Sequence, residues 1–465
     1  MIPLRLTFRF ISILVLLAAT LNAQQSLLGP WHGDIDLKVQ KLSFEVVFKE
    51  TDGKASGTIS IPIQRAKDLP LESVVLDPEA VAFDLRAGPG LAKFRGAMKD
   101  GTITGSFQQG ITGGTFTLTP GRIPKVVQDD SQLPYTRKSI RIPAGDHTLA
   151  GTVSTPRGEG PFPAVILVTG SGPQDRDAEV AGFPVFKTLA DHLARSNMAV
   201  LAYDDRGCGE SEGDFSQATT MMLADDAEAA WRALSQQERI DPKRVGILGH
   251  SEGGLIAPIV AARVPEVAFL ILVAGPAVRG EAILKEQLQL ILKAQGASAE
   301  VVASEAAMQA RLLECCKTDS GWEVVQEDLR KVLKSSLQAL PAASKRAIGD
   351  LDVYAENQAR AQIDQTRSPW FRQFVSLDPS EYLAAVRVPT LALFGGKDLQ
   401  VPPAQSEAPL RQAMKDNAHL EVLTLKESNH LFQVARTGAP SEYARLEKAF
   451  DPEFVRTLRE WVAKR

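Results

Sequence analysis

One serine of this chain lies in a pattern that is typical of a nucleophile. Residues 249–254 read Gly-His-Ser-Glu-Gly-Gly, which contains G-x-S-x-G around Ser251. A strand is predicted at 245–248 and a helix at 255–263, so the pattern occupies the turn between them. Glycine on both sides of the serine suits such a turn because it has no Cβ to obstruct the backbone. The spacing predicts that the Ser251 hydroxyl projects from a tight turn and attacks an electrophilic carbon.

A serine hydroxyl is a weak nucleophile without a base, and the base needs an acid to orient it. Asp398 follows a predicted strand at 390–394, and His430 follows a predicted strand at 420–425. The carboxyl ends of parallel strands meet at one edge of an open α/β sheet. We therefore predict a catalytic triad of Ser251, Asp398 and His430.

Other histidines and the cysteines fit these roles less well. His250 stands beside the serine on the turn and is expected to pack there, and His419 precedes its strand and so lies at the opposite edge of the sheet. Cys208 has no suitably spaced base for a thiol nucleophile. Cys315 and Cys316 are adjacent, and adjacent cysteines form a disulfide only with backbone strain, so we expect buried thiols.

An oxyanion that forms during attack needs backbone N–H donors near the nucleophile. We expect one donor from Glu252, at the start of the helix after the turn. A second should come from the glycine-rich loop that follows a predicted strand at 164–169. In that loop Ser171 and Gly172 are both candidates, and Ser171 is the preferred one.

Two charged loops follow predicted strands of the same sheet, so we expect them near these candidates. Residues 175–177, Asp-Arg-Asp, could bind a polar group of a substrate, but ion pairs that fix the loop are the preferred interpretation. Residues 203–211, Tyr-Asp-Asp-Arg-Gly-Cys-Gly-Glu-Ser, follow a strand. We expect them to brace the site rather than to take part in catalysis.

The elements that must position these residues occupy 136–465, where apolar runs alternate with helical patterns. This order is typical of a sheet built from βαβ units. Between 277 and 388 helical spacing replaces the strand signal, which predicts a helical cap inserted into the sheet to shape the substrate pocket. The predicted strands are 140–142, 149–154, 164–169, 199–203, 245–248, 268–273, 390–394 and 420–425.

Residues 24–121 have a different pattern of short apolar runs with period two, separated by Asp-Gly turns. They predict a separate N-terminal antiparallel β domain, either an open sheet, a sandwich or a barrel. A polar, proline-containing stretch at 122–135 is expected to be a linker. The predicted strands of the β domain are 42–48, 57–63, 74–76, 80–85, 92–98, 102–107 and 114–118.

Residues 1–23 have the order of a secretory signal peptide. Arg5 and Arg9 precede an apolar stretch at 10–19, and the small residue Ala23 marks the expected cleavage site. The apolar stretch is shorter than the roughly 20 residues that span a bilayer, although an uncleaved anchor is the alternative. We therefore expect a secreted or periplasmic protein without a stable membrane span after cleavage.

Composition excludes several classes of protein. The chain has 465 residues, of which 44% are hydrophobic and 23% charged, as in a globular protein. Its net charge of -4 argues against a nucleic-acid partner, because such partners are held by phosphate neutralisation. Three cysteines allow neither a disulfide scaffold nor a CxxC-type zinc site.

Together these motifs resemble the α/β-hydrolase superfamily, and within it secreted bacterial carboxylesterases of the serine aminopeptidase and dienelactone-hydrolase-like branch. The glutamate after the serine, together with the loop at 170–177, resembles a thermophilic-type carboxylesterase group that also carries an extra N-terminal domain. The resemblance implies an α/β-hydrolase fold and ester hydrolysis through an acyl-enzyme, with no metal and no organic cofactor. The matching segments are residues 170–177, 203–211, 249–254, 394–398 and 429–430.

Three functions remain open from the sequence. The leading hypothesis is a carboxylesterase whose partner is a small ester with a short or medium acyl chain. A serine peptidase, aminopeptidase or amidase with the same triad is the second, with Glu252 as the acid that would hold a substrate amine. In the third, the β domain binds lipid or glycan and the hydrolase domain is not catalytic. The sequence does not indicate an oligomeric state.

Overall fold

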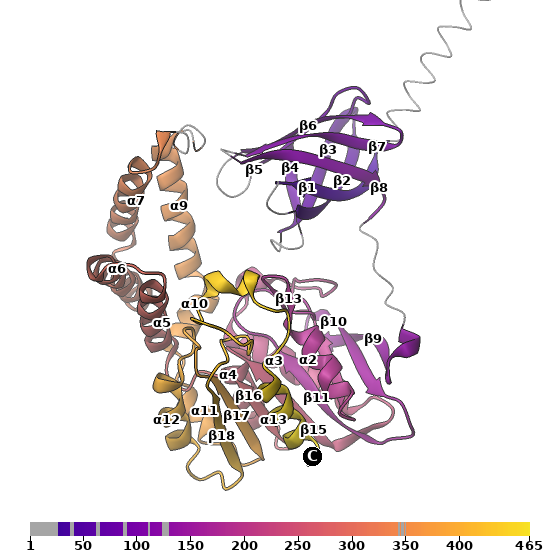
Figure 1. The fold of residues 1–465 in the computed structure, drawn as a ribbon, viewed down its shortest axis with the longest axis vertical. Coiled ribbons are helices and arrows are strands. Elements are labelled where there is room, and N and C mark those ends of the chain that lie inside the picture. The colour runs from indigo at the N-terminus through magenta and orange to yellow at the C-terminus, as the bar shows by residue number, and fades with distance from the viewer. Residues whose placement is uncertain are drawn as a thin grey trace, which may run out of the picture. The chain divides into compact units, whose positions relative to one another are not determined.

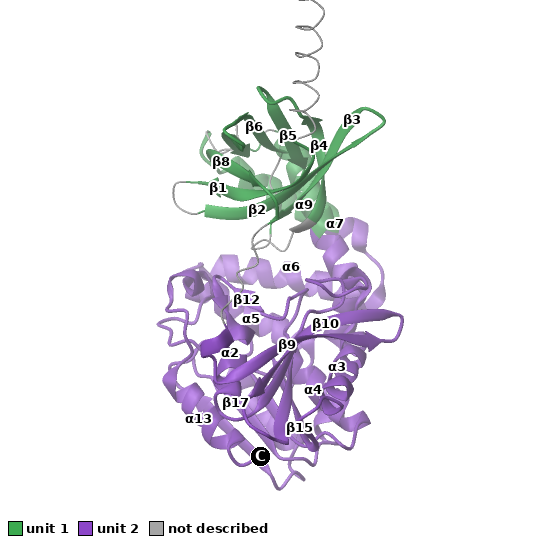
Figure 2. Ribbon diagram, turned by 90° about the vertical axis from the view of Figure 1, so that its right-hand side faces the viewer, with its two compact units in different colours: residues 1–128, 326–361 green, residues 129–325, 362–465 purple. Residues whose placement is uncertain are grey.

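The computed structural model describes residues 27–465, except for short gaps at 38–40, 62–65, 87–90, 110–111, 123–129, 343–344, 346–347 and 349. The predicted signal peptide and most of the predicted linker lie outside the described residues. The chain forms two compact units (Figure 2). Residues 1–128 and 326–361 form the first unit, and residues 129–325 and 362–465 form the second.

The N-terminal strands close into an antiparallel barrel, which selects one of the three predicted β architectures. Each strand pairs with the next, and the last, β8, pairs back with the first, β1 (Figure 1). The strands are β1 Gly29–Asp36, β2 Lys41–Thr51, β3 Lys54–Ile61, β4 Ala66–Val75, β5 Val81–Arg86, β6 Leu91–Lys99, β7 Thr102–Gln109 and β8 Thr112–Pro120.

Aromatic side chains fill the barrel. In β2 every second residue from Phe44 to Phe48 is buried, as period-two patterning requires when one face of a strand points inward. The rings of Phe83 and Phe94 stack with centroids 4.5 Å apart, and Phe116 meets Phe94 edge to face. The interior is therefore a packed core of the kind that small barrels have.

Two barrel strands differ from the prediction. The prediction contained no strand at β1, whose sequence includes Gly29, Pro30 and Gly33, and it covered only the end of β4, which contains Pro70. Proline and glycine weaken the strand signal of a sequence. In β4 the register also shifts against both neighbouring strands, so the side-chain alternation that predicts a strand is broken.

The second unit is built on an eight-stranded, mostly parallel sheet with the order β18-β17-β16-β15-β11-β14-β10-β9. Its two N-terminal strands, β9 and β10, are antiparallel to their neighbours. The strands are β9 Tyr135–Ala144, β10 His147–Pro156, β11 Phe162–Val168, β14 Ala199–Tyr203, β15 Ile240–His250, β16 Leu270–Val273, β17 Thr390–Gly395 and β18 Leu420–Leu425. The eight strands that the sequence predicted are all present.

Helices cover both faces of this sheet (Figure 1). All seven residues of β11 are buried, as its continuous apolar run indicated. Helices α2 Val185–Ala194 and α13 Pro452–Val462 pack on one face, and α3 Thr220–Ser235 and α4 Gly253–Arg263 on the other. Further elements of the unit are η2 Asp130–Gln132, β12 Glu179–Val180, β13 Phe183–Pro184, η3 Phe215–Gln217, α12 Pro403–Ala413 and η4 Pro440–Arg445.

A helical insert separates β16 from β17, as predicted. Its helices are α5 Gly280–Ala294, α6 Ala299–Thr318, α7 Trp322–Gln338, α9 Leu351–Arg367, α10 Pro369–Ser376 and α11 Pro379–Leu383. Residues 326–361 of the insert belong to the first unit, and the rest of the insert belongs to the second. Within the described part of the chain, no helix has the length and apolar character needed to cross a membrane.

Candidate active site

Ser251 occupies a strained turn between β15 and α4. Its φ is +57°, in the left-handed region that residues with a side chain rarely adopt. The Ser251 N–H donates to the carbonyl of Val273 at 2.9 Å, which ties the turn to the adjacent strand β16. Strain of this kind persists only where the surrounding structure enforces it, and it is common at functional sites.

The glycines around the serine are required by close backbone approach. A Cβ on Gly249 would lie 1.9 Å from the carbonyl oxygen of Gly253, and a Cβ on Gly253 would lie 2.2 Å from that of Val168. Both distances are far shorter than any van der Waals contact. The turn can therefore form only with glycine at these two positions.

Asp398 and His430, predicted as the acid and the base, lie together at the carboxyl edge of the sheet. The distance from His430 Nδ1 to Asp398 Oδ2 is 2.7 Å, and both side chains are buried. The other oxygen of Asp398 accepts the backbone N–H groups of Gln400 and Val401 at 2.7 and 2.9 Å. This arrangement holds the proton of the imidazole on Nδ1 and leaves Nε2 as the atom that can accept a proton.

His250 packs against His430, as the sequence predicted. The two rings lie with centroids 4.8 Å apart, and His250 Nε2 is 2.8 Å from the carbonyl oxygen of His430. Because a carbonyl can only accept, Nε2 of His250 carries the proton. Burial, together with the neighbouring His430, lowers the pKa of His250 to about 4. His250 is therefore a neutral packing residue and not a base.

The loop after β11 runs against the nucleophile. A Cβ on Gly170 would lie 3.0 Å from Ser251 Cβ and 3.5 Å from Ser251 Oγ. Ser171 and Gly172, the predicted oxyanion residues, follow Gly170 directly, and the third predicted residue, Glu252, precedes the first residue of α4. The N-terminus of α4 therefore lies beside Ser251, where its partial positive charge stabilises an anion. Gly170 was not among the predicted residues, although it is the first glycine of this loop.

A buried aspartate fixes this loop. Asp205 accepts the Thr169 hydroxyl at 2.8 Å and the backbone N–H of Gln174 at 2.9 Å, and its own N–H donates to the Gln174 carbonyl at 3.0 Å. The Gln174 side chain in turn donates to the Gly170 carbonyl at 3.1 Å. Burial raises the pKa of Asp205 to about 8. The segment at 203–211 therefore braces the site, as predicted.

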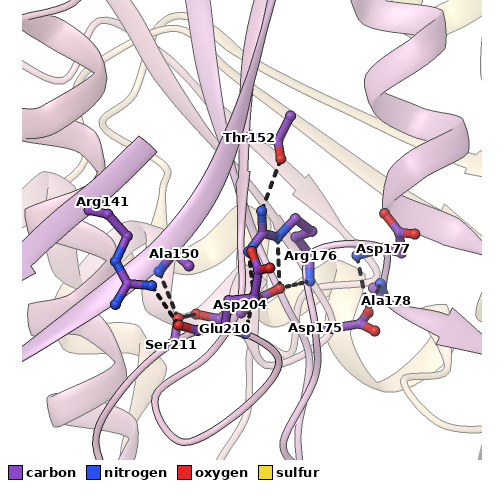
Figure 3. Close-up of polar contacts among 10 residues, drawn as sticks. All are labelled: Arg141, Ala150, Thr152, Asp175, Arg176, Asp177, Ala178, Asp204, Glu210 and Ser211. Carbon is purple, nitrogen blue, oxygen red and sulfur yellow. Dashed lines mark hydrogen bonds and ion pairs between the residues drawn. The ribbon is translucent and has the colours of Figure 1, made fainter. Parts of the chain in front are cut away.

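Arg176 supplies a second brace, which Figure 3 shows. Its guanidinium donates to both oxygens of Asp204, at 2.9 and 2.5 Å, and contacts Glu210 at 3.1 Å. The backbone N–H of Arg176 also donates to Asp204, at 2.7 Å. Asp175 meanwhile accepts the N–H groups of Asp177 and Ala178. These contacts show that the side chains of Arg176 and Asp175 fix the loop, in line with the preferred interpretation.

The side chain of Glu252, which an aminopeptidase would use to hold a substrate amine, instead binds donors of the protein itself. It is 1% exposed and accepts hydrogen bonds from the Thr220 hydroxyl at 2.8 Å and from the Trp370 indole N–H at 2.9 Å. The Ser171 hydroxyl is a third donor. Burial raises the pKa of Glu252. Trp370 lies far away in the sequence, and no motif marks it as a neighbour of the turn.

The three cysteines form no disulfide. Burial raises the pKa of Cys315 and Cys316, whereas Cys208 lies in the segment at 203–211 and donates its backbone N–H to the Asp205 carbonyl at 2.9 Å. Among the residues that the structure describes, no group of three or more His, Cys, Asp or Glu side chains is arranged to hold a metal ion.

Comparison with known proteins gives the family. Residues 183–431, more than half of the chain, match the family described as serine aminopeptidase, S33. The chain belongs to this family. As an S33-family protein with this fold, it is a serine hydrolase of the α/β-hydrolase class, and it carries an eight-stranded barrel at its N-terminus. Ser251, Asp398 and His430 all lie within the matched residues.

The chain is also similar to individual proteins. Esterase EstD of Thermotoga maritima is 26% identical over 79% of this S33-family chain and 75% of its own length. The uncharacterized protein MT2364 of Mycobacterium tuberculosis is 28% identical over 35% of the chain and 57% of its own length. Among solved structures, the similarity to the Pyrococcus furiosus esterase Pf2001 extends over 73% of this chain and 95% of the esterase chain, with 16% identity and a TM-score of 0.45.

Proposed function

We propose that this S33-family hydrolase cleaves carboxylic esters with short or medium acyl chains through an acyl-enzyme on Ser251. The observation that carries the proposal is the buried pair of His430 and Asp398, 2.7 Å apart, at the same sheet edge as the strained turn of Ser251. The similarity to a relative named as an esterase supports the choice of substrate.

The proposed mechanism uses the groups described above. His430 Nε2 takes the proton of the Ser251 hydroxyl as Oγ attacks the ester carbon, and Asp398 stabilises the imidazolium that results. Backbone N–H groups of Glu252 and of Ser171 or Gly172 bind the oxyanion. The alcohol leaves with the proton from His430, and water then hydrolyses the acyl-enzyme by the same route. No step requires a metal or an organic cofactor.

The family description favours a second candidate, an aminopeptidase, in which Glu252 was the predicted acid for a substrate amine. However, its carboxylate is buried and three neutral donors of the protein occupy it. A substrate amine would have to displace them. The contacts of Glu252 therefore favour esters over unblocked peptides.

A substrate panel tests this choice. We expect kcat/KM for p-nitrophenyl acetate, butyrate and octanoate to exceed that for aminoacyl p-nitroanilides by at least about 100-fold. Ser251→Ala, measured in parallel, controls for contaminating hydrolases. Faster release of p-nitroaniline than of p-nitrophenol would contradict the ester proposal and support the aminopeptidase.

We also propose that the protein is exported, with cleavage after Ala23. The charged start and the short apolar stretch at 10–19 support this proposal. The three cysteines, none of which forms a disulfide, suit either location and do not bear on it. N-terminal sequencing of the protein from the periplasmic fraction of an expressing bacterium should begin at Gln24. An intact Met1 in the cytoplasmic fraction would contradict export.

For the barrel, lipid or glycan binding remains a proposal, and it must use the outer surface. The interior is filled by the rings of Phe44, Phe83, Phe94 and Phe116. A ligand could enter it only by displacing these core side chains. Co-sedimentation of the full chain with anionic vesicles and with peptidoglycan tests the proposal. Recovery of the protein in the supernatant of both would contradict it.

A further inference from the structure

The side chain of Glu252 joins three elements that surround the nucleophile turn. Thr220 lies in the first turn of α3, Trp370 lies in α10 of the insert, and Ser171 lies in the loop after β11. Each donates a hydrogen bond to the carboxylate. All of these residues belong to the second unit.

Helix α10 is held at this place by a second contact. The side-chain oxygen of Gln373 accepts the backbone N–H of Met221 at 2.8 Å, in the first turn of α3. Trp370 and Phe374 stack with centroids 5.2 Å apart, which fixes the direction of the indole. Helix α10 is thus attached to the hydrolase body at two points, and one of them is the residue next to the nucleophile.

We propose that Glu252 is a positioning residue whose carboxylate locks α10 and the oxyanion loop onto the nucleophile turn. The inference rests on the proposed function, in which the backbone N–H of the same residue binds the oxyanion. The carboxylate therefore holds the donor from α4 in place, and it holds Ser171 of the opposing loop as well. Displacements of about 1 Å in such a site cost roughly 100-fold in rate.

The chemistry of the donors explains why a carboxylate is needed. The indole N–H of Trp370 can only donate, and it lies 2.9 Å from both oxygens of Glu252. Because this N–H is close to both oxygens, a glutamine at 252 would place its NH₂ group against the indole N–H in either orientation. The isosteric change Glu252→Gln therefore breaks the network while it preserves the volume of the side chain.

The insert provides a matched control. Trp322 in α7 also donates its indole N–H to a carboxylate, that of Asp319, at 2.9 Å. Both tryptophans belong to the insert. Trp322→Phe and Trp370→Phe each keep an aromatic ring and delete one indole N–H bond to a carboxylate. Only the second removes a bond to the nucleophile turn.

The test compares wild type, Glu252→Gln, Trp370→Phe and Trp322→Phe in the full chain. Three quantities are measured: kcat and KM for p-nitrophenyl butyrate, the second-order rate of Ser251 phosphonylation by a fluorophosphonate, and the unfolding midpoint. We expect Glu252→Gln and Trp370→Phe to lower kcat and the phosphonylation rate about tenfold or more. KM should stay within about threefold, and Trp322→Phe should keep the wild-type rate within about twofold.

Wild-type kcat and phosphonylation rates in both Glu252→Gln and Trp370→Phe would overturn the proposal. So would equal losses in Trp370→Phe and Trp322→Phe, since these would reflect stability alone. If Glu252→Gln does not fold, the comparison of the two tryptophan variants decides. Failure of the proposed function has a different signature: wild type is phosphonylated at Ser251 but hydrolyses no ester, and the positioning role is then read from phosphonylation.

Discussion

At the scale of single residues, the site depends on which atom of His430 carries the proton. Asp398 uses one oxygen for two backbone N–H groups and the other for His430 Nδ1, so its orientation is fixed. Replacing Asp398 by asparagine should therefore change the tautomer of His430 in a predictable way.

Asp398→Asn should lower kcat for p-nitrophenyl butyrate by about 10³- to 10⁴-fold. The amide oxygen of asparagine will keep the two backbone N–H bonds, so its NH₂ group will face Nδ1 of His430. The imidazole then adopts the tautomer with its proton on Nε2, which cannot take the proton of Ser251. The unfolding midpoint serves as the control for folding. A kcat within tenfold of wild type would contradict the role assigned to Asp398.

His250 should not contribute to the pH dependence of the reaction between pH 5 and 8. Burial lowers its pKa to about 4, so the ring is neutral throughout this range. Glutamine can donate the same hydrogen bond to the carbonyl of His430. The pH profile of kcat/KM for His250→Gln should therefore keep the acid limb of the wild-type profile. A limb displaced by more than about half a pH unit would show that His250 titrates during catalysis.

At the scale of elements, the loop after β11 is held by side chains from the segment after β14. Asp205 is the central one, with Thr169 and Gln174 as its donors. Its pKa of about 8 lies far above the roughly 4 of an aspartate in an unfolded chain. Between these values the folded protein keeps a proton that the unfolded chain loses, so this group lowers the free energy of unfolding as pH rises.

Asp205→Asn removes this titration and can keep both contacts, with its oxygen facing the Gln174 N–H and its NH₂ group facing the Thr169 hydroxyl. The stability of the variant relative to wild type should therefore increase from pH 5 to pH 8. Urea unfolding of both proteins at several pH values in this range measures the difference. Parallel stability curves would show that Asp205 is ionised in the folded protein throughout the range.

The elements of the hydrolase sheet could be predicted because buried parallel strands carry continuous apolar runs, as β11 does. The strands β1 and β4 were missed because proline, glycine and register shifts weaken the alternation that marks a strand. Within the site, the sequence led to Asp398 and His430 through their places after strands. It could not lead to Trp370, whose contact with Glu252 depends on how the insert folds back onto α3.

At the scale of the whole molecule, the two units have separate cores. The barrel core combines phenylalanine rings with aliphatic side chains, and the core around α2 and α13 is built from sheet strands and helices of the second unit. The sequence predicted a change of pattern between the β domain and the hydrolase. It did not predict that residues 326–361 of the insert group with the barrel, since helical spacing does not say which unit a helix joins.

Phe94→Ala should destabilise the barrel by about 3–5 kcal/mol, because Phe94 is fully buried and contacts four other aromatic rings. Since the barrel has its own core, kcat at 20 °C should stay within about twofold of wild type. Tryptophan fluorescence in a urea titration, followed together with activity, measures both. A shift of the activity loss in Phe94→Ala to the same lower urea concentration at which its barrel unfolds would show that the two cores depend on each other.

The central claim is that Ser251 is the nucleophile of an ester hydrolase, and its most direct test is the kcat of Ser251→Ala for p-nitrophenyl butyrate. We predict a fall of at least about 10⁴-fold with an unchanged circular dichroism spectrum and unfolding midpoint. Turnover of the ester by Ser251→Ala at the wild-type rate would contradict the claim.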